Sequence, residues 1–183
     1  MTTSKVFFLC FSIFTNTLIV QSQILRKENI DTKKSKVPFF ELVDINLKKI
    51  KQTDLIGKVV IINFWGINCP PCIAEIPKLN IIVKKFKSEN VVFIGICPLT
   101  PKRFTMDKYE EIKYFLKKKE FLYRICPVED FKIFSTKFNL RYAPTHFIID
   151  KSGYIVYKYT GIINEKDFVK LISNELNCNN KKQ

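Results

Sequence analysis

The chain has few of the residues that build metal sites. It contains a single histidine, His146, and only two of its six cysteines, Cys69 and Cys72, lie close together. Structural zinc sites usually take four cysteine and histidine ligands from two closely spaced pairs. The other cysteines are isolated along the chain, so the sequence argues against a zinc site and predicts no bound metal.

Arginine is also scarce, although the chain is strongly basic. The formal net charge is +14, yet 27 of the 31 basic residues are lysines scattered along the chain. Arginine, whose planar fork suits phosphate groups, occurs only four times. The sequence also has no recognised nucleic-acid-binding motif, so the charge does not indicate a nucleic-acid partner.

No hydrophobic run reaches the length of about 20 residues that spans a bilayer. The apolar stretch 6–20 follows Lys5 and is interrupted by polar residues. A cationic start, a short apolar core and small or tolerated residues at 20–22 predict a secretory signal peptide over residues 1–22, with a membrane anchor as the alternative. The protein is therefore expected to be periplasmic or otherwise extracytoplasmic.

The rest of the chain has the composition of one globular domain. With 183 residues, 46% of them hydrophobic, it can bury one ordinary core. The polar stretch 23–36 predicts a flexible lead-in, residues 37–177 the domain, and residues 178–183 a polar tail. We expect a strand pair over 39–50, and strands at 58–64, 91–97, 121–126, 145–149 and 154–159. Helices are expected at 73–86, 106–119, 131–138 and 167–176, which gives an α/β sheet with helices on both faces.

The most informative motif is Cys69-Pro70-Pro71-Cys72, which follows the apolar run 59–65 and opens a predicted helix. At such a junction two sulfurs come within reach of one disulfide, and the first lies at the positive end of the helix. A purely structural disulfide is disfavoured because closing so short a loop removes little entropy from the unfolded chain. The motif therefore favours a catalytic dithiol.

Over about residues 37–177 the sequence resembles the thioredoxin-fold thiol-disulfide oxidoreductases, specifically their exported TlpA/ResA-like branch. The shared segments, in order, are Gly57-Lys58, Asn63-Phe64-Trp65, the CPPC motif, Glu75-Ile76-Pro77, Ala143-Pro144-Thr145 and Phe147-Ile148-Ile149-Asp150. The resemblance implies a thioredoxin-like α/β fold, with a central mixed β-sheet flanked by helices, an N-terminal β-hairpin and a central αβ insertion. It also implies an enzyme that needs no cofactor.

The same resemblance implies roles for individual residues. Cys69 is expected to be the exposed nucleophile and Cys72 the buried resolving cysteine, which agrees with the chemistry of thiol-disulfide exchange. Trp65, Ala143 and Pro144 are the expected substrate-binding residues, with Pro144 as the family's cis-proline. No charged residue lies between the two cysteines, and this favours a reductant over a strong oxidant.

Glu75 is the third expected catalytic residue. It lies three residues after Cys72, so a helix returns it to nearly the same face. In ResA-like proteins an acid at this position sits beside the dithiol and influences proton transfer, whereas an exposed, inert helix glutamate is the alternative. Asn63 stands where thioredoxins carry a buried acid, which leaves Glu75 as the obvious proton acceptor. For His146, packing or a surface position is favoured over catalysis.

Cys97 and Cys126 end two predicted strands that the resemblance places side by side in parallel. Neighbouring strands lie about 4.8 Å apart, so a second disulfide is one interpretation of this pair. Two small buried hydrophobic side chains are the favoured interpretation.

The predicted function is the reduction of protein disulfides through a mixed-disulfide intermediate. The expected partners are a disulfide-containing protein substrate and a membrane-borne thiol electron donor, because a dithiol in an oxidising compartment must be kept reduced. Apocytochrome c during haem attachment is the family's best-known client. One alternative is a copper-binding chaperone of the same fold that uses the two cysteines and His146. Another is a thiol peroxidase of the AhpC/TSA type, which requires a Pro-x-x-x-Thr-x-x-Cys run that is absent around Cys69.

Overall fold

The structure, a computed structural model, describes residues 30–31, 34–99 and 108–178. The predicted signal peptide, most of the lead-in and all of the tail except Cys178 lie outside the described residues. Among the residues described, no helix is long and apolar enough to cross a membrane.

A seven-stranded mixed sheet forms the centre of the protein, with the strand order β1-β9-β8-β5-β6-β7 and β2 also paired with β9. β5 runs parallel to β6, and β6 runs parallel to β7, while β8 is antiparallel to both β5 and β9. The strands are β1 (Ile30–Asp31), β2 (Ser35–Lys36), β5 (Val59–Phe64), β6 (Val91–Pro98), β7 (Arg124–Val128), β8 (Thr145–Ile149) and β9 (Tyr154–Thr160). The mixed sheet confirms the fold class expected from the sequence.

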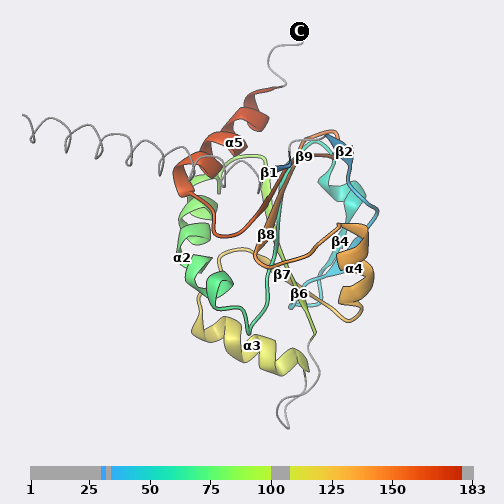
Figure 1. The fold of residues 1–183 in the computed structure, drawn as a ribbon, viewed down its shortest axis with the longest axis vertical. Coiled ribbons are helices and arrows are strands. Elements are labelled where there is room, and N and C mark those ends of the chain that lie inside the picture. The colour runs from blue at the N-terminus through green and yellow to red at the C-terminus, as the bar shows by residue number, and fades with distance from the viewer. Residues whose placement is uncertain (1–29, 32–33, 100–107, 179–183) are drawn as a thin grey trace, which may run out of the picture.

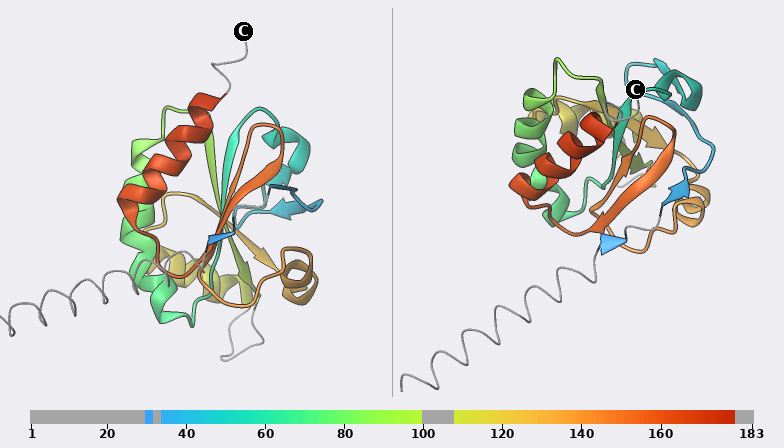
Figure 2. Two further views of the ribbon diagram at one scale, coloured as in Figure 1. Left: turned by 45° about the horizontal axis from the view of Figure 1, so that its top comes forward. Right: turned by 90° about the horizontal axis from the view of Figure 1, so that it is seen from above.

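Helices cover both faces of this sheet (Figures 1 and 2). On one face lie α2 (Pro70–Lys85) and α5 (Glu165–Asn177), which contact each other, while α3 (Lys108–Lys118) packs below them. On the opposite face lie α4 (Phe131–Lys137) and the hairpin of β3 (Glu41–Val43) and β4 (Lys49–Lys51), which the 3-10 helix η1 (Gln52–Leu55) follows. We call these the α2 face and the α4 face.

Alternation along the strands explains how both faces are filled. All six residues of β5 are buried. Val60, Ile62 and Phe64 join the core of the α4 face, whereas Val59 and Ile61 join that of the α2 face. Consecutive apolar residues are what a central strand covered on both sides requires.

The lead-in differs from the expected flexible segment. Its residues 30–31 and 35–36 form β1 and β2, which pair with β9 at the edge of the sheet. Strand pairing satisfies backbone N–H and C=O groups whatever the side chains are, so polar sequence did not reveal it. The strand expected at 121–126 also begins later, at Arg124.

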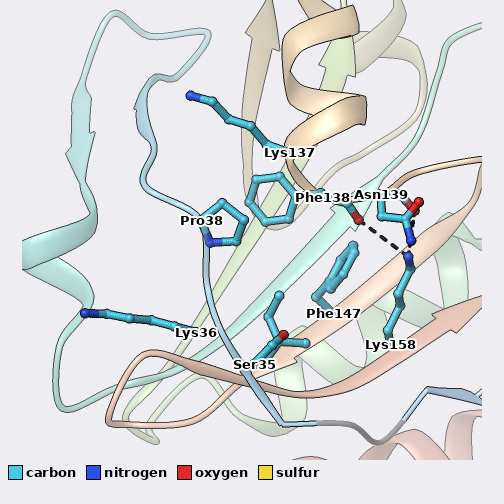
Figure 3. A pocket seen from close by; sticks show the side chains of 9 residues that line it. Ser35, Lys36, Pro38, Lys137, Phe138, Asn139, Phe147 and Lys158 are labelled. Carbon is cyan, nitrogen blue, oxygen red and sulfur yellow. Dashed lines mark hydrogen bonds between the residues drawn. The ribbon is translucent and has the colours of Figure 1, made fainter.

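Next to this edge, a cavity of about 240 Å³ lies between β2, β9 and the end of α4 (Figure 3). Inside it the Lys158 Nζ donates to the carbonyl oxygens of Phe138 and Asn139, at 3.4 and 2.7 Å. A cation bound to carbonyls at a helix C-terminus stabilises that end of the helix. Phe138 and Phe147, which also line the cavity, belong to the core of the α4 face.

Cys97 and Cys126 are both free and fully buried. In the β6–β7 register Cys126 is opposite Ile96, and Cys97 is opposite Pro127. This one-residue offset directs the two thiols to opposite faces, so Cys97 packs in the cluster around Trp65 and Cys126 in the core of the α4 face. The favoured interpretation as buried small side chains is confirmed.

Candidate active site

Cys69 and Cys72 form a disulfide at the N-terminus of α2, with their Cα atoms 5.3 Å apart. Cys69 is the N-cap residue, and the Cys72 backbone N–H donates to its Sγ at 3.4 Å. The two intervening prolines occupy the first turn, where a missing N–H leaves no helical bond unmade. Cys69 is half-buried, whereas only 3% of Cys72 is exposed. A reagent in solution therefore reaches Cys69 first.

The Ala143–Pro144 peptide bond is cis, as the resemblance implied. Pro144 is buried, while Ala143 and Tyr142 are exposed. The carbonyl oxygen of Ala143 lies 3.7 Å from Cys69 Sγ. The loop before β8 therefore places exposed backbone directly beside the outer sulfur.

Trp65 lies beneath the disulfide and not on the surface beside it. Its side chain is 2% exposed and packs on the rings of Phe115 and Phe121, at centroid distances of 5.8 and 4.9 Å. Cys72 belongs to the same apolar cluster. Trp65 Nε1 has no hydrogen-bond partner within the described part of the chain.

Glu75 has no solvent exposure, so the alternative of an exposed, inert helix glutamate is wrong. Its Oε1 accepts a 2.6 Å hydrogen bond from the backbone N–H of Ile163, the residue before the N-cap of α5. Because Glu75 lies three residues after Cys72 on this helix, its side chain is close to the same face of α2.

His146 is also fully buried, and it faces Glu75. Its Nε2 lies 3.1 Å from Glu75 Oε2, and its Nδ1 lies 3.3 Å from Asn63 Nδ2. The ring packs on Tyr159 and Phe168. Sequence reasoning expected packing or a surface position and missed this contact. The signal that could have found it is the antiparallel β5–β8 pairing, which sets Asn63 opposite His146.

The remaining thiols differ in character from the CPPC pair. Burial raises the pKa of Cys97 far above its usual range, and burial raises that of Cys126 to about 12. Both therefore stay protonated and inert. Cys178 is exposed and lies at the far end of α5.

The described residues do not assemble the ligands of a copper site. No group of three or more histidine, cysteine, aspartate or glutamate side chains within them is placed to hold a metal ion. His146 is directed at Glu75 and Asn63, so its nitrogens are engaged away from the two sulfurs.

Comparison with known proteins agrees with this geometry. The AhpC/TSA family model matches residues 34–158. A thiol-disulfide oxidoreductase ResA of Bacillus cereus is 34% identical over 125 residues, covering 68% of this chain and 67% of that protein. ResA of Bacillus subtilis (strain 168) is 31% identical over 149 residues, covering 80% and 78%.

Among solved structures, a thiol:disulfide interchange protein of the thioredoxin family from Chlorobium tepidum TLS has a TM-score of 0.66 and 26% identity. The match covers 80% of this chain and 99% of that one. In this chain the two cysteines lie together at a helix N-terminus, the arrangement that exchange between dithiols and disulfides requires. The chain belongs to the AhpC/TSA family and, within it, to the ResA/TlpA-like thioredoxin-fold proteins, and its activity is that of a thiol-disulfide oxidoreductase.

Proposed function

We propose that this protein reduces disulfides in extracytoplasmic protein substrates, with Cys69 as the nucleophile and Cys72 as the resolving cysteine. The observation that carries the proposal is the asymmetry of the bonded pair. Cys69 is half-buried at the N-cap of α2, whereas Cys72 is buried beneath it. Only the outer sulfur is open to a disulfide in another protein.

The reaction has two exchange steps. The Cys69 thiolate attacks one sulfur of the substrate disulfide, forming a mixed disulfide and releasing the other substrate sulfur as a thiolate. The Cys72 thiolate then attacks Cys69 Sγ, forming the Cys69–Cys72 disulfide and releasing the second substrate thiolate. The substrate gains two electrons, and the enzyme's dithiol is oxidised to the disulfide seen in the structure.

Glu75 is the proposed proton acceptor for Cys72. A buried thiol is a poor nucleophile until its proton leaves, because the thiolate is the attacking species. Water has little access to Cys72, and the Glu75 carboxyl group is buried on the same side of α2. A carboxylate in this place can take the proton as the mixed disulfide resolves.

The proposed docking surface for substrate is the backbone at Ala143, beside the cis-proline Pro144. An extended substrate segment that pairs with this exposed loop would bring its disulfide to Cys69. Trp65 is buried, so we assign it to the packing beneath the disulfide and not to the substrate surface.

Two features support a reductant. No charged residue lies between the cysteines, and the negative end of the Ala143 carbonyl dipole faces Cys69 Sγ. Neither stabilises a Cys69 thiolate, and a stabilised thiolate is what makes such a pair a strong oxidant. The predicted signal peptide places the protein in an oxidising compartment, where a membrane-borne thiol donor would have to re-reduce it.

Trapping of the mixed disulfide tests this proposal. The reduced Cys72→Ser variant, mixed with insulin whose disulfides are intact, is expected to accumulate a covalent adduct through Cys69. Dithiothreitol should release this adduct. The Cys69→Ser variant should form none, and Cys178→Ser should turn over insulin as the unchanged protein does. Reduction of insulin that survives the loss of Cys69 would contradict the proposal.

Peroxidase activity is the second candidate, because the family model that matches is that of AhpC/TSA. The reduced protein, incubated with hydrogen peroxide, is expected to consume it no faster than free dithiothreitol. Rapid consumption that requires Cys69 would replace disulfide reduction with peroxide reduction as the proposed function.

A further inference from the structure

We propose that His146 is a positioning residue that orients the Glu75 carboxyl group to take the Cys72 proton, and that Asn63 fixes the tautomer of His146. This inference rests on the proposed function, because it concerns the step in which the mixed disulfide resolves. It concerns three buried polar side chains on the α2 face.

These side chains come from three different elements. Asn63 lies on β5, Glu75 on α2 and His146 on β8. Their exposed fractions are 4%, 0% and 0%. Burying polar groups is costly unless they are paired. The three therefore form one unit, running from Asn63 Nδ2 to His146 Nδ1 at 3.3 Å and from His146 Nε2 to Glu75 Oε2 at 3.1 Å.

The chemistry of the amide group fixes which imidazole nitrogen carries the proton. The Nδ2 group of Asn63 can only donate, so His146 Nδ1 must accept. In a neutral imidazole the proton then lies on Nε2, the nitrogen that faces Glu75. His146 therefore presents a donor to Oε2.

Both oxygens of Glu75 then face hydrogen-bond donors. Oε1 accepts from the Ile163 N–H at 2.6 Å, and Oε2 faces His146 Nε2. Two donors and the first turn of α5 therefore surround this carboxyl group and set its orientation. In this disulfide state the His146 N–H is not aligned with Oε2. Catalytic hydrogen bonds of this kind commonly tighten only when the reacting state forms.

The other groups around Glu75 do not replace His146. Tyr123 stays protonated, chiefly because burial raises its pKa. Cys97 stays protonated because burial raises its pKa. Tyr159 stacks on the ring of the histidine, and no lysine or arginine in the described ranges forms an ion pair with Glu75. Among the side-chain contacts found in these ranges, that of His146 brings a ring nitrogen within 3.1 Å of a Glu75 oxygen.

The proton and electrons balance in the step concerned. The Cys72 thiol gives its proton to the Glu75 carboxylate, and the resulting thiolate uses one electron pair to form the bond to Cys69 Sγ. The bond between Cys69 and the substrate breaks, and its electron pair leaves with the substrate thiolate. His146 keeps its own proton throughout and only orients the acceptor.

The tautomer can be observed directly, because His146 is the only histidine of the chain. In an ¹⁵N NMR spectrum of the tag-free protein labelled in its imidazole ring, we expect a protonated Nε2 and an unprotonated Nδ1. The Asn63→Leu variant, which keeps the ring and removes the donor, should lose this preference. A protonated Nδ1 in the unchanged protein would overturn the inference.

The rate at which the glutathione adduct on Cys69 resolves tests whether His146 positions Glu75. The His146 change is made both in the otherwise unchanged protein and in the Cys72→Ser variant, and glutathione disulfide is the probe. The glutathione adduct on Cys69 is followed by acid quenching and mass spectrometry. The His146→Phe variant should resolve the adduct at least about 10-fold more slowly, a part of the about 100-fold or more that a general base contributes. In the Cys72→Ser background, where only the first attack occurs, the same change should alter the rate less than twofold.

Matched variants separate positioning from packing. His146→Gln keeps a donor towards Glu75 and an acceptor towards Asn63, so its resolution rate should stay near that of the unchanged protein. Phe168→Leu loosens the packing on the His146 ring and should not make the adduct accumulate. The inference would be overturned if the glutathione adduct accumulated equally in Phe168→Leu and His146→Phe, or if it did not accumulate in His146→Phe. If His146→Phe does not fold, slower resolution in Asn63→Leu takes its place. If the unchanged protein forms no adduct at all, the proposed function itself fails.

Discussion

The two faces of the sheet differ in how well their buried polar side chains are hydrogen-bonded. Around the α4 face the buried polar side chains are satisfied by short, aligned hydrogen bonds. Asp44 accepts from two backbone N–H groups and from Arg124, each at 2.9 Å, and Thr145 donates to the Tyr142 carbonyl at 2.6 Å. On the α2 face, Glu75 and His146 lie close together without an aligned hydrogen bond between them.

We infer that this difference separates residues that hold the fold from residues that take part in the proposed exchange. Buried polar groups in folded proteins are nearly always paired, so a buried pair out of alignment calls for an explanation. The α4 face contains a large apolar core and well-paired polar groups, and it stabilises the sheet. The α2 face buries a carboxyl group against an imidazole, and the carboxyl group belongs to the helix that begins at the two cysteines.

Replacing either cysteine of the CPPC motif should have the largest effect. We expect Cys72→Ser to lower the rate of disulfide turnover by at least about 1,000-fold, because residues of one catalytic unit fail together. Its folding stability should change far less than its activity. Cys178→Ser, which alters an exposed thiol, is the matched control and should retain full turnover of insulin.

A large-to-small change in the α4 face should lower folding stability much more than activity. Phe138 is 3% exposed and packs on Phe40, Phe64 and Phe147. We expect Phe138→Ala to lower the free energy of unfolding by about 3–5 kcal/mol, measured by urea denaturation. Ile133→Ala, at an exposed position of α4, should change it by less than about 0.5 kcal/mol.

Phe138→Ala also sharpens the contrast between the faces. The folded fraction of this variant should reduce glutathione disulfide at the rate of the unchanged protein. A large loss of that rate in fully folded protein would show that the α4 face takes part in the chemistry.

Neutralising Glu75 should separate activity from stability on the α2 face. We expect Glu75→Gln to slow resolution of the mixed disulfide about 100-fold, a typical general-base contribution. The amide has the shape of the carboxyl group and keeps an oxygen that accepts from the Ile163 N–H, so the free energy of unfolding should change by about 1 kcal/mol or less. Quenched-flow kinetics and urea denaturation on the same sample measure both. If the free energy of unfolding fell and the mixed disulfide resolved no more slowly, Glu75 would be a residue that stabilises the fold and not a proton acceptor.

The smallest effect concerns the pH dependence of stability near the hairpin. Burial alone would raise the pKa of Asp44, but hydrogen bonds from the Lys48 backbone and the Arg124 side chain outweigh it and lower the pKa below the ordinary 3.8. Because the pKa is lower in the folded state, the stabilisation is complete above the ordinary value and is lost as pH falls below it.

Asp44→Asn should therefore be less stable than the unchanged protein at pH 7, by about 1–3 kcal/mol. The difference should shrink as the pH is lowered through 4 towards 2. Urea denaturation across this range measures it. A difference that is constant with pH would show that the Asp44 charge does not contribute.

Much of this structure could be predicted from the sequence. The CPPC motif after an apolar strand placed the two cysteines at the start of a helix, and the segment Ala143-Pro144-Thr145 indicated the cis-proline. Alternating strands and helices gave the fold class. These features depend on local sequence and on the order of motifs, which are visible in a single chain.

What the sequence left open or missed depends on register. Whether Cys97 and Cys126 meet is decided by a one-residue offset between β6 and β7. Likewise, the contact between His146 and Glu75 depends on which residue of β8 lies opposite Asn63. A shift of one residue would turn either side chain to the other face of the sheet.

The Cys69–Cys72 pair is proposed to work as a reductant. Its reduction potential, measured by equilibration with glutathione or dithiothreitol buffers, tests this directly. Trp65 is the only tryptophan of the chain and packs in one cluster with Cys72, so its fluorescence can report the redox state. We predict a value near thioredoxin's about −270 mV or lower. A value near about −120 mV, that of a strong oxidant, would contradict the account.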